Sequence, residues 1–159
     1  MSYKCNCCDK IHEGLPDVGI DKPSLAAEIP EEEWPGRVEL TDDTCIIDGQ
    51  DFFVRGVLII PIYGDDDGLG FGVWISQKQE NFQSYVDHPD SAEIGPYFGW
   101  FASELGPYAP TLGLKAMTHF QGNNQRPLIE LEPTEHPLSI DFHNGISLER
   151  AWEIVHEYL

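Results

Sequence analysis

The run Asp51–Ile62 is the feature that most limits how this chain can fold. It is nearly all apolar and is rich in β-branched and aromatic residues. Such a run predicts a strand that is buried on both faces, and therefore a central strand of a sheet. Asp48-Gly49-Gln50-Asp51, which leads into it, is typical of a hairpin turn, so we expect Cys45–Asp48 to form the preceding strand.

Arg55 is the exception inside this apolar run. Two accounts of it stay open: it pairs with a carboxylate, or it reaches solvent at a β-bulge near Gly56. We expect Pro61 to mark the end of the strand, because proline cannot donate a hydrogen bond to a neighbouring strand.

The middle of the chain alternates between apolar and polar residues in short runs separated by turn residues. Gly64–Gly68 is expected to be a polar connection, and its three aspartates lack the spacing of an EF-hand loop. Alternation predicts further strands at Phe71–Ser76, Tyr97–Phe101, Leu114–Phe120 and Leu128–Glu132.

Two segments have the periodicity of helices that bury one face. These are Gln79–Val86 and Leu148–Tyr158, and Ser147 is placed to cap the second. Pro133–Gly145, between the last strand and the last helix, is expected to be irregular.

These elements predict an α+β fold in a single domain, with a mostly antiparallel, curved sheet and flanking helices. We divide the domain into a zinc-knuckle segment at residues 1–16, a wrapping loop at 17–43 and the sheet with its helices at 44–159. Prolines limit the wrapping loop to short helical turns.

The opening segment holds three of the four cysteines of the chain. Cys5 and Cys8 have the spacing that lets a tight turn direct two sulfurs at one ion, and His12 and Cys45 complete a tetrahedral set. We therefore predict a structural zinc site, with Cys7 as an alternative thiol. A reduced thiol cluster without metal, or a redox pair, is the other interpretation. Four protein ligands leave no position for water, which favours a structural role over hydrolysis.

The charge of the chain limits its partners. It has 28 acidic and 9 basic residues, for a formal net charge of -19. This charge repels nucleic acid and anionic membranes, and it suits either a basic protein partner or simple solubility. The sequence has no apolar run of membrane-spanning length, and its first residues lack the apolar core of a signal peptide, so we expect a cytoplasmic protein.

This chain resembles a family of small uncharacterised bacterial proteins, a domain of unknown function, in a series of motifs along the sequence. The resemblance implies a single domain and a bacterial origin, and it supplies no catalytic residues. It is carried by Cys5-x-x-Cys8 with His12, Glu13–Asp17, Cys45–Gly49, Phe52–Leu58, Gly72–Ser76, Phe98–Trp100, Arg126–Thr134, His136–Leu138 and Gly145–Ser147.

Two functions of different classes fit these observations. The first is a non-enzymatic protein-interaction module, for example one that covers a basic partner as an immunity protein covers a toxin. The alternative is a small-ligand-binding protein or a hydrolase-like enzyme, because histidine beside carboxylate performs acid–base chemistry and arginine holds anions. The candidate residues for this alternative are His119, Arg126, Glu130, Glu132 and His136, beside the aromatic residues Trp74, Tyr97 and Trp100.

Overall fold

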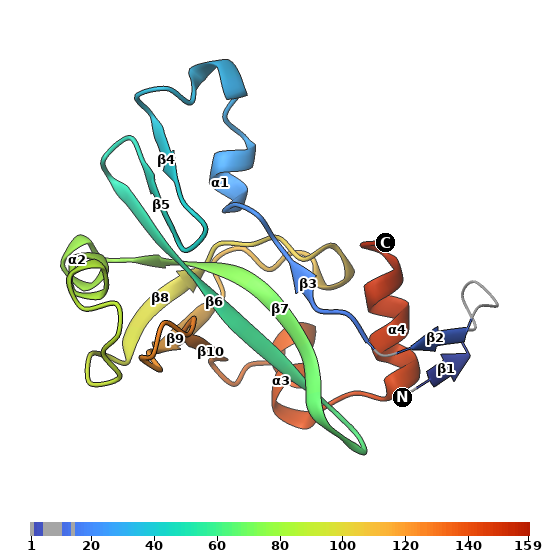
Figure 1. Cartoon of the computed structure of the whole chain (residues 1–159). Coiled ribbons are helices and arrows are strands. Elements are labelled where there is room, and N and C mark those ends of the chain that lie inside the picture. The colour runs from blue at the N-terminus through green and yellow to red at the C-terminus, as the bar shows by residue number, and fades with distance from the viewer. Residues whose placement is uncertain (1, 5–10, 14) are drawn as a thin grey trace.

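The computed structural model describes residues 2–4, 11–13 and 15–159, and the chain has the α+β architecture that the sequence predicts (Figure 1). The strands are β1 Ser2–Lys4, β2 Ile11–Glu13, β3 Val18–Gly19, β4 Val38–Leu40, β5 Thr44–Ile47, β6 Asp51–Ile62, β7 Asp65–Gln77, β8 Tyr97–Phe101, β9 Lys115–His119 and β10 Leu128–Leu131. The helices are α1 Ser24–Ala27, α2 Gln79–Asp87, α3 Pro137–Asn144 and α4 Leu148–His156, and short 3-10 turns lie at η1 Glu31–Glu33 and η2 Gly106–Tyr108.

Strands β6 to β10 form a closed barrel. The sheet is curved, as predicted, and it curves so far that its first and last strands pair with each other. Each strand pairs antiparallel with the next, and β10 returns to pair with β6 in parallel. An odd number of up-and-down strands gives the first and the last the same direction, so the closing pair has to be parallel. Gly56 lies at this closure, where an added Cβ would stand 2.5 Å from Ile129 Cδ1.

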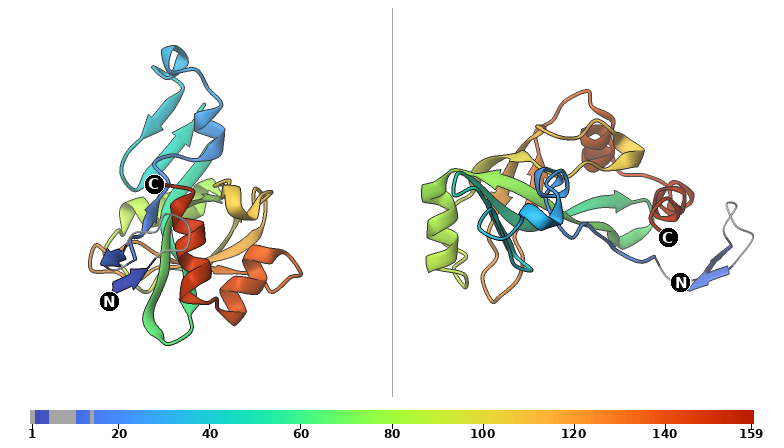
Figure 2. Two further views of the ribbon diagram at one scale, coloured as in Figure 1. Left: turned by 90° about the vertical axis from the view of Figure 1, so that its right-hand side faces the viewer. Right: turned by 90° about the horizontal axis from the view of Figure 1, so that it is seen from above.

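The two long strands of the barrel change partners part-way along. β6 pairs with β5 over Asp51–Val54 and with β10 at Val57. β7 pairs with β3 at Phe71–Gly72 and with β8 at Ile75–Ser76. The sheet therefore forks between these positions. Strands β4 and β5 with α1 leave the barrel as an arm, which stands above it in Figure 1 and in the left view of Figure 2.

Two apolar clusters stabilise these two parts. The larger cluster fills the barrel and extends under the helices, with Phe82 from α2, Leu138 from α3 and Trp152 from α4 among its buried members. The smaller cluster lies between the arm and the outside of the barrel and consists of Ala26, Cys45, Ile47, Phe53 and Trp74, with partly buried neighbours around them.

The prediction that β6 is buried on both faces holds only for its first half. Phe53 belongs to the smaller cluster and Val54 to the larger one, so both faces are covered there. Further along, alternate side chains reach the surface, and Ile59 is exposed. The strand ends just after Pro61, as predicted, and its register against β7 shifts at that point.

Two predicted boundaries are wrong for reasons that the structure makes clear. Gly64–Gly68 is not a connection, because β7 already begins at Asp65, whose carboxylate accepts hydrogen bonds from the backbone of the next residues. Pro133–Gly145 is not irregular, because it contains α3. Pro137 starts that helix, at a position where its missing N–H costs nothing.

Within residues 17–43 the structure has more order than a wrapping loop. Short helical turns are present, as predicted, at α1 and η1, but β3 and β4 add a strand at each edge of the large sheet. These strands are only two or three residues long, which is too short for an alternation to be seen in the sequence.

Candidate functional site

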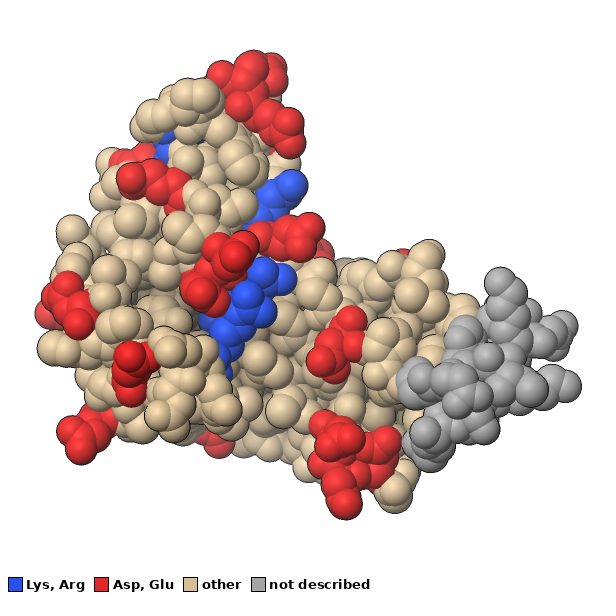
Figure 3. All heavy atoms as spheres, viewed as in Figure 1, with Lys and Arg blue, Asp and Glu red and all other residues tan. Residues whose placement is uncertain are grey.

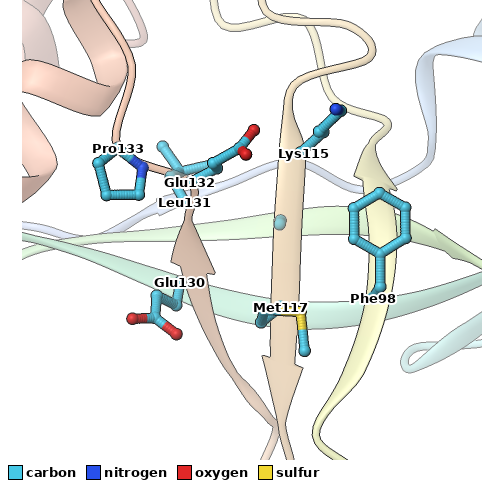
Figure 4. A pocket seen from close by; sticks show the side chains of 8 residues that line it. Phe98, Lys115, Met117, Glu130, Leu131, Glu132 and Pro133 are labelled. Atoms are coloured by element: carbon cyan, nitrogen blue, oxygen red, sulfur yellow. The ribbon is translucent and has the colours of Figure 1, made fainter.

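The outer surface of β8, β9 and β10 carries exposed side chains in rows that the strand register creates. Phe98 lies opposite Met117, and Met117 lies opposite Glu130, so these three form one row across the sheet (Figure 4). Inward positions alternate with them and are filled by Gly99, Ala116 and Ile129, among others. We call this surface the β8–β10 face, made of Phe98, Trp100, Lys115, Met117, His119, Leu128, Glu130 and Glu132.

Large apolar side chains are unusually exposed on the β8–β10 face. Phe98 is 42% exposed, Trp100 is 47% exposed and Leu128 is 38% exposed. The two aromatic rings meet edge to face, with their centroids 5.1 Å apart. Exposed aromatic residues grouped in this way are enriched at protein-interaction sites, where burying them against a partner removes a large apolar area from water.

The polar groups of the face lie between these apolar ones. His119 Nε2 lies 2.8 Å from Glu130 Oε1, and both side chains are about half exposed. Solvent screens such a pair, so its contribution to stability is small. Lys115 and Glu132 lie near each other, one row away from Glu130 (Figure 4). The face therefore offers carboxylates at the surface and aromatic rings beside them.

Two shallow hollows flank β10 on this face. One has a volume of about 260 Å³ and is lined by Phe98, Met117 and Pro133 among others. The other, of about 350 Å³, is lined by Leu128, Ile59 and Phe142 among others. Glu130 borders both. The smaller volume is below the usual range for small-molecule sites and the larger one is at its low end, and both hollows are open to solvent. They fit single side chains of a partner better than an enclosed substrate.

The residues predicted for an enzymatic site do not converge. His119 and Glu130 are together, but Arg126 turns to the arm, where its Nε donates to Asp43 Oδ1 over 2.9 Å. His136 caps α3: its Nδ1 accepts a hydrogen bond from the backbone N–H of Leu138. The Nε2 of His136 therefore carries the proton and donates to the carbonyl of Pro110 over 2.6 Å.

The three aromatic candidates also separate. Trp74 is fully buried in the smaller apolar cluster, where its indole N–H donates to the carbonyl of Ile20. Tyr97 packs against Phe120, and its hydroxyl lies 3.1 Å from that of Ser84 on α2. Only Trp100 reaches the β8–β10 face.

The predicted zinc ligands fall mostly outside what the structure describes. Cys5 and Cys8, and Cys7 with them, lie outside the described residues, and for His12 only the backbone in β2 is described. Cys45 is fully buried in the smaller apolar cluster, and burial raises the pKa of its thiol to about 11. Among the described residues no group of three potential ligands could hold a metal ion. The zinc site stays a prediction.

Four residues of the β8–β10 face were not predicted to be functional: Phe98, Lys115, Met117 and Leu128. A signal for the first of these was present in Phe98-Gly99-Trp100, because alternation turns both aromatic rings to one face while glycine occupies the other. An added Cβ at Gly99 would collide with the Ser76 carbonyl of β7. That glycine therefore lets β8 approach β7 closely.

The described residues include no helix with both the length and the apolar character needed to cross a membrane. Searches of curated proteins and of solved structures found no match. The sequence model of a family described as uncharacterised protein conserved in bacteria (DUF2199) matches residues 4–146, which is most of the chain. This chain therefore belongs to that family of uncharacterised bacterial proteins.

Proposed function

We propose that this protein is a non-enzymatic binding module that holds a basic protein partner on its β8–β10 face. The observation that carries the proposal is the edge-to-face pair of Phe98 and Trp100, both close to half exposed, on the same face as Glu130 and Glu132. Aromatic faces attract the cationic side chains of lysine and arginine, and neighbouring carboxylates attract them as well.

The charge of the whole chain supports a basic partner. With a formal net charge of -19, the protein attracts cationic proteins over long distances and speeds their encounter. The apolar side chains of the face would then supply most of the affinity, because exposed salt bridges alone contribute little. In this proposal the negative charge attracts the partner and the exposed apolar side chains hold it.

A protein partner is favoured over a small substrate by the shape of the face. The hollows beside β10 are shallow, and the histidine and carboxylate between them are open to water. Acid–base catalysis works best where water is excluded and a further group holds the substrate. Arg126 and His136, the other candidates for such roles, make their contacts elsewhere.

The test is capture of a partner from a native bacterial lysate on the immobilised protein at low salt. We expect a stoichiometric basic protein to be retained, and Trp100→Ser to weaken its binding about tenfold or more, as expected for a central aromatic residue. Raising the salt concentration to about 0.5 M should weaken binding too, because it screens the charges.

Val86→Ser is the matched control. Val86 is an exposed apolar residue of α2 with 46% of its surface accessible, against 47% for Trp100, but it lies off the face. It should leave capture unchanged. The proposal is wrong if no stoichiometric partner is retained, or if Trp100→Ser and Val86→Ser behave alike.

We also propose that the opening segment binds a structural zinc ion, and the spacing of Cys5 and Cys8 with the nearby His12 supports this. Elemental analysis of the purified protein should find one equivalent of zinc, and Cys5→Ser should abolish it. Cys45→Ser tests the fourth ligand separately: loss of zinc would make Cys45 a ligand, and retained zinc with lowered stability would make it a core residue. Metal-free wild-type protein would contradict the zinc proposal.

A further inference from the structure

Arg55 lies at the fork of the sheet. On β6 it stands between the segment paired with β5, which ends at Val54, and the contact with β10 at Val57. Its register partner on β7 is Trp74, which likewise stands between the contacts with β3 and β8. The Arg55 guanidinium group lies near Gly19 of β3, Trp74 of β7 and the Asp42 carbonyl of the arm.

Among the described residues, the guanidinium group of Arg55 lies over the Trp74 ring and has one long hydrogen bond. Gly19 and Gly72 lie beside it, since a Cβ added to either would stand in ordinary van der Waals contact with guanidinium nitrogens, at 3.4 to 3.5 Å. The group lies 5.7 Å from the centre of the Trp74 ring. Its Nε is buried and has no hydrogen-bond partner among the described residues. Within the described part of the chain, only Nη1 has a hydrogen-bond acceptor, the carbonyl of Asp42, at 3.4 Å.

Arg126 brings a second guanidinium group to the same place. Its Nη2 approaches the same carbonyl of Asp42, also at 3.4 Å, while its Nε pairs with Asp43. Arg55 belongs to β6, and Arg126 lies just before β10, which begins at Leu128. One weak acceptor is thus shared by two cationic groups, and both contacts are long for hydrogen bonds.

The missing partner of Arg55 is notable in so acidic a chain. Acidic residues outnumber basic ones 28 to 9. Arg37 pairs with two carboxylates, and Arg126 and Arg150 pair with one each. Within the described residues Arg55 has none, although carboxylates are abundant. On the face shown in Figure 3, basic side chains gather near the middle of the molecule with acidic ones on either side.

We propose that Arg55, with Arg126 beside it, binds the carboxylate group of a ligand. A planar carboxylate accepts two parallel hydrogen bonds from one guanidinium, and it would take the place of the poor Asp42 contact. The negative charge of the protein favours a group with a single charge over a phosphate dianion, because repulsion grows with the charge of the ligand. This site is distinct from the β8–β10 face and does not depend on the function proposed for it.

The test follows the Nε–H signals of the arginines by NMR while sodium acetate replaces sodium chloride at constant ionic strength. We expect the Arg55 signal, assigned from its loss in Arg55→Lys, to move and saturate. Arg126→Gln should raise the acetate concentration needed about tenfold, the effect of losing one hydrogen bond to a charged group. The Arg37 signal is the internal control, because its guanidinium is already paired twice.

Two further probes identify the class and the source of the ligand. N-acetylglycine binding more tightly than acetate would support the carboxylate terminus of a peptide, and equal binding would support a free small carboxylate. The proposal is overturned if the Arg55 signal moves no more than that of Arg37, or if inorganic phosphate moves it and acetate does not.

Discussion

Gly56 occupies a point of the barrel wall where the interior has no room for another carbon atom. An added Cβ would come within 2.5 to 3.0 Å of the Ile129 side chain and the Pro127 carbonyl. Both neighbours belong to the segment that closes the barrel, and the Pro127 carbonyl accepts the backbone N–H of Val57. The wall therefore closes at this point only because residue 56 has no side chain.

Gly56→Ala should lower the free energy of unfolding by about 2 kcal/mol, as expected for overpacking of a well-filled interior. Urea unfolding followed by circular dichroism measures this change. Gly106→Ala is the control, because no atom lies within 4 Å of a Cβ added there and its backbone is not left-handed. Equal effects of the two substitutions would show that crowding at the closure is not the cause.

His136, a candidate for catalysis, has a structural role at the start of α3. A histidine near carboxylates was a reasonable catalytic candidate, but its ring is used at both nitrogens by the backbone. His136→Ala should cost about 1 kcal/mol of unfolding free energy, because α3 loses its N-cap. His136→Asn should recover most of this, since asparagine also caps helices. Full stability of the alanine variant in urea unfolding would contradict the capping role.

At the level of elements, Tyr108 ties the turn η2 to helix α3. Its hydroxyl donates to Asp141 Oδ2 over 2.6 Å, and it is almost fully buried. Burial, and next the hydrogen bond to Asp141, raise the pKa of Tyr108 above its ordinary value of 10.0. The folded protein therefore holds this proton more tightly than the unfolded chain does.

The protonated Tyr108 accordingly stabilises the fold fully below pH 10 and loses this contribution as the pH rises further. Above pH 10 the unfolded chain releases the proton and the folded protein keeps it, so stability falls by up to about 1.4 kcal/mol per pH unit. Tyr108→Phe should be about 2 kcal/mol less stable at pH 8 and should fall less steeply between pH 10 and 11. Parallel curves for the two proteins would refute the role of this proton.

The elements that the sequence predicts best are those that bury one face, because burial of one face gives an alternating pattern in strands and a periodic one in helices. Strands β8, β9 and β10 and helices α2 and α4 lie where alternation or helical periodicity places them. The start of β7 was missed because Asp65–Gly68 is polar, although backbone pairing with β6 holds it in the ladder. Helix α3 has only eight residues, too few for a helical periodicity to stand out in the sequence, and Pro137 occupies its first turn.

The sequence predicts the candidate site only where its residues lie on adjacent strands. His119 and Glu130 come together because β9 and β10 are adjacent and both residues point outward. Arg126 lies just outside β10, and its direction depends on the arm, which the sequence does not position. Closure of the barrel also depends on long-range contacts such as Gly56 with Ile129, which leave no periodic signal.

For the whole molecule, the excess of acidic residues lowers the stability of the folded state through repulsion between carboxylates. A formal net charge of -19 on a chain of 159 residues means that carboxylates repel each other more strongly in the compact state than in the unfolded one. Increasing sodium chloride from about 0.01 to 0.15 M should raise the melting temperature by a few degrees, since salt screens this repulsion. A melting temperature that falls with salt would show that attractive pairs dominate instead.

The parallel pairing of β6 with β10 joins the beginning of the barrel to its end. On a ribosome, β6 emerges long before Leu128–Leu131 has been made, so the ring stays open until nearly the whole domain is available. During that interval the edge of β6 that receives β10 has no partner, and it is one of the most apolar segments of the chain. Nascent chains that stop before residue 128 should consequently be the species most prone to aggregate and most in need of a chaperone.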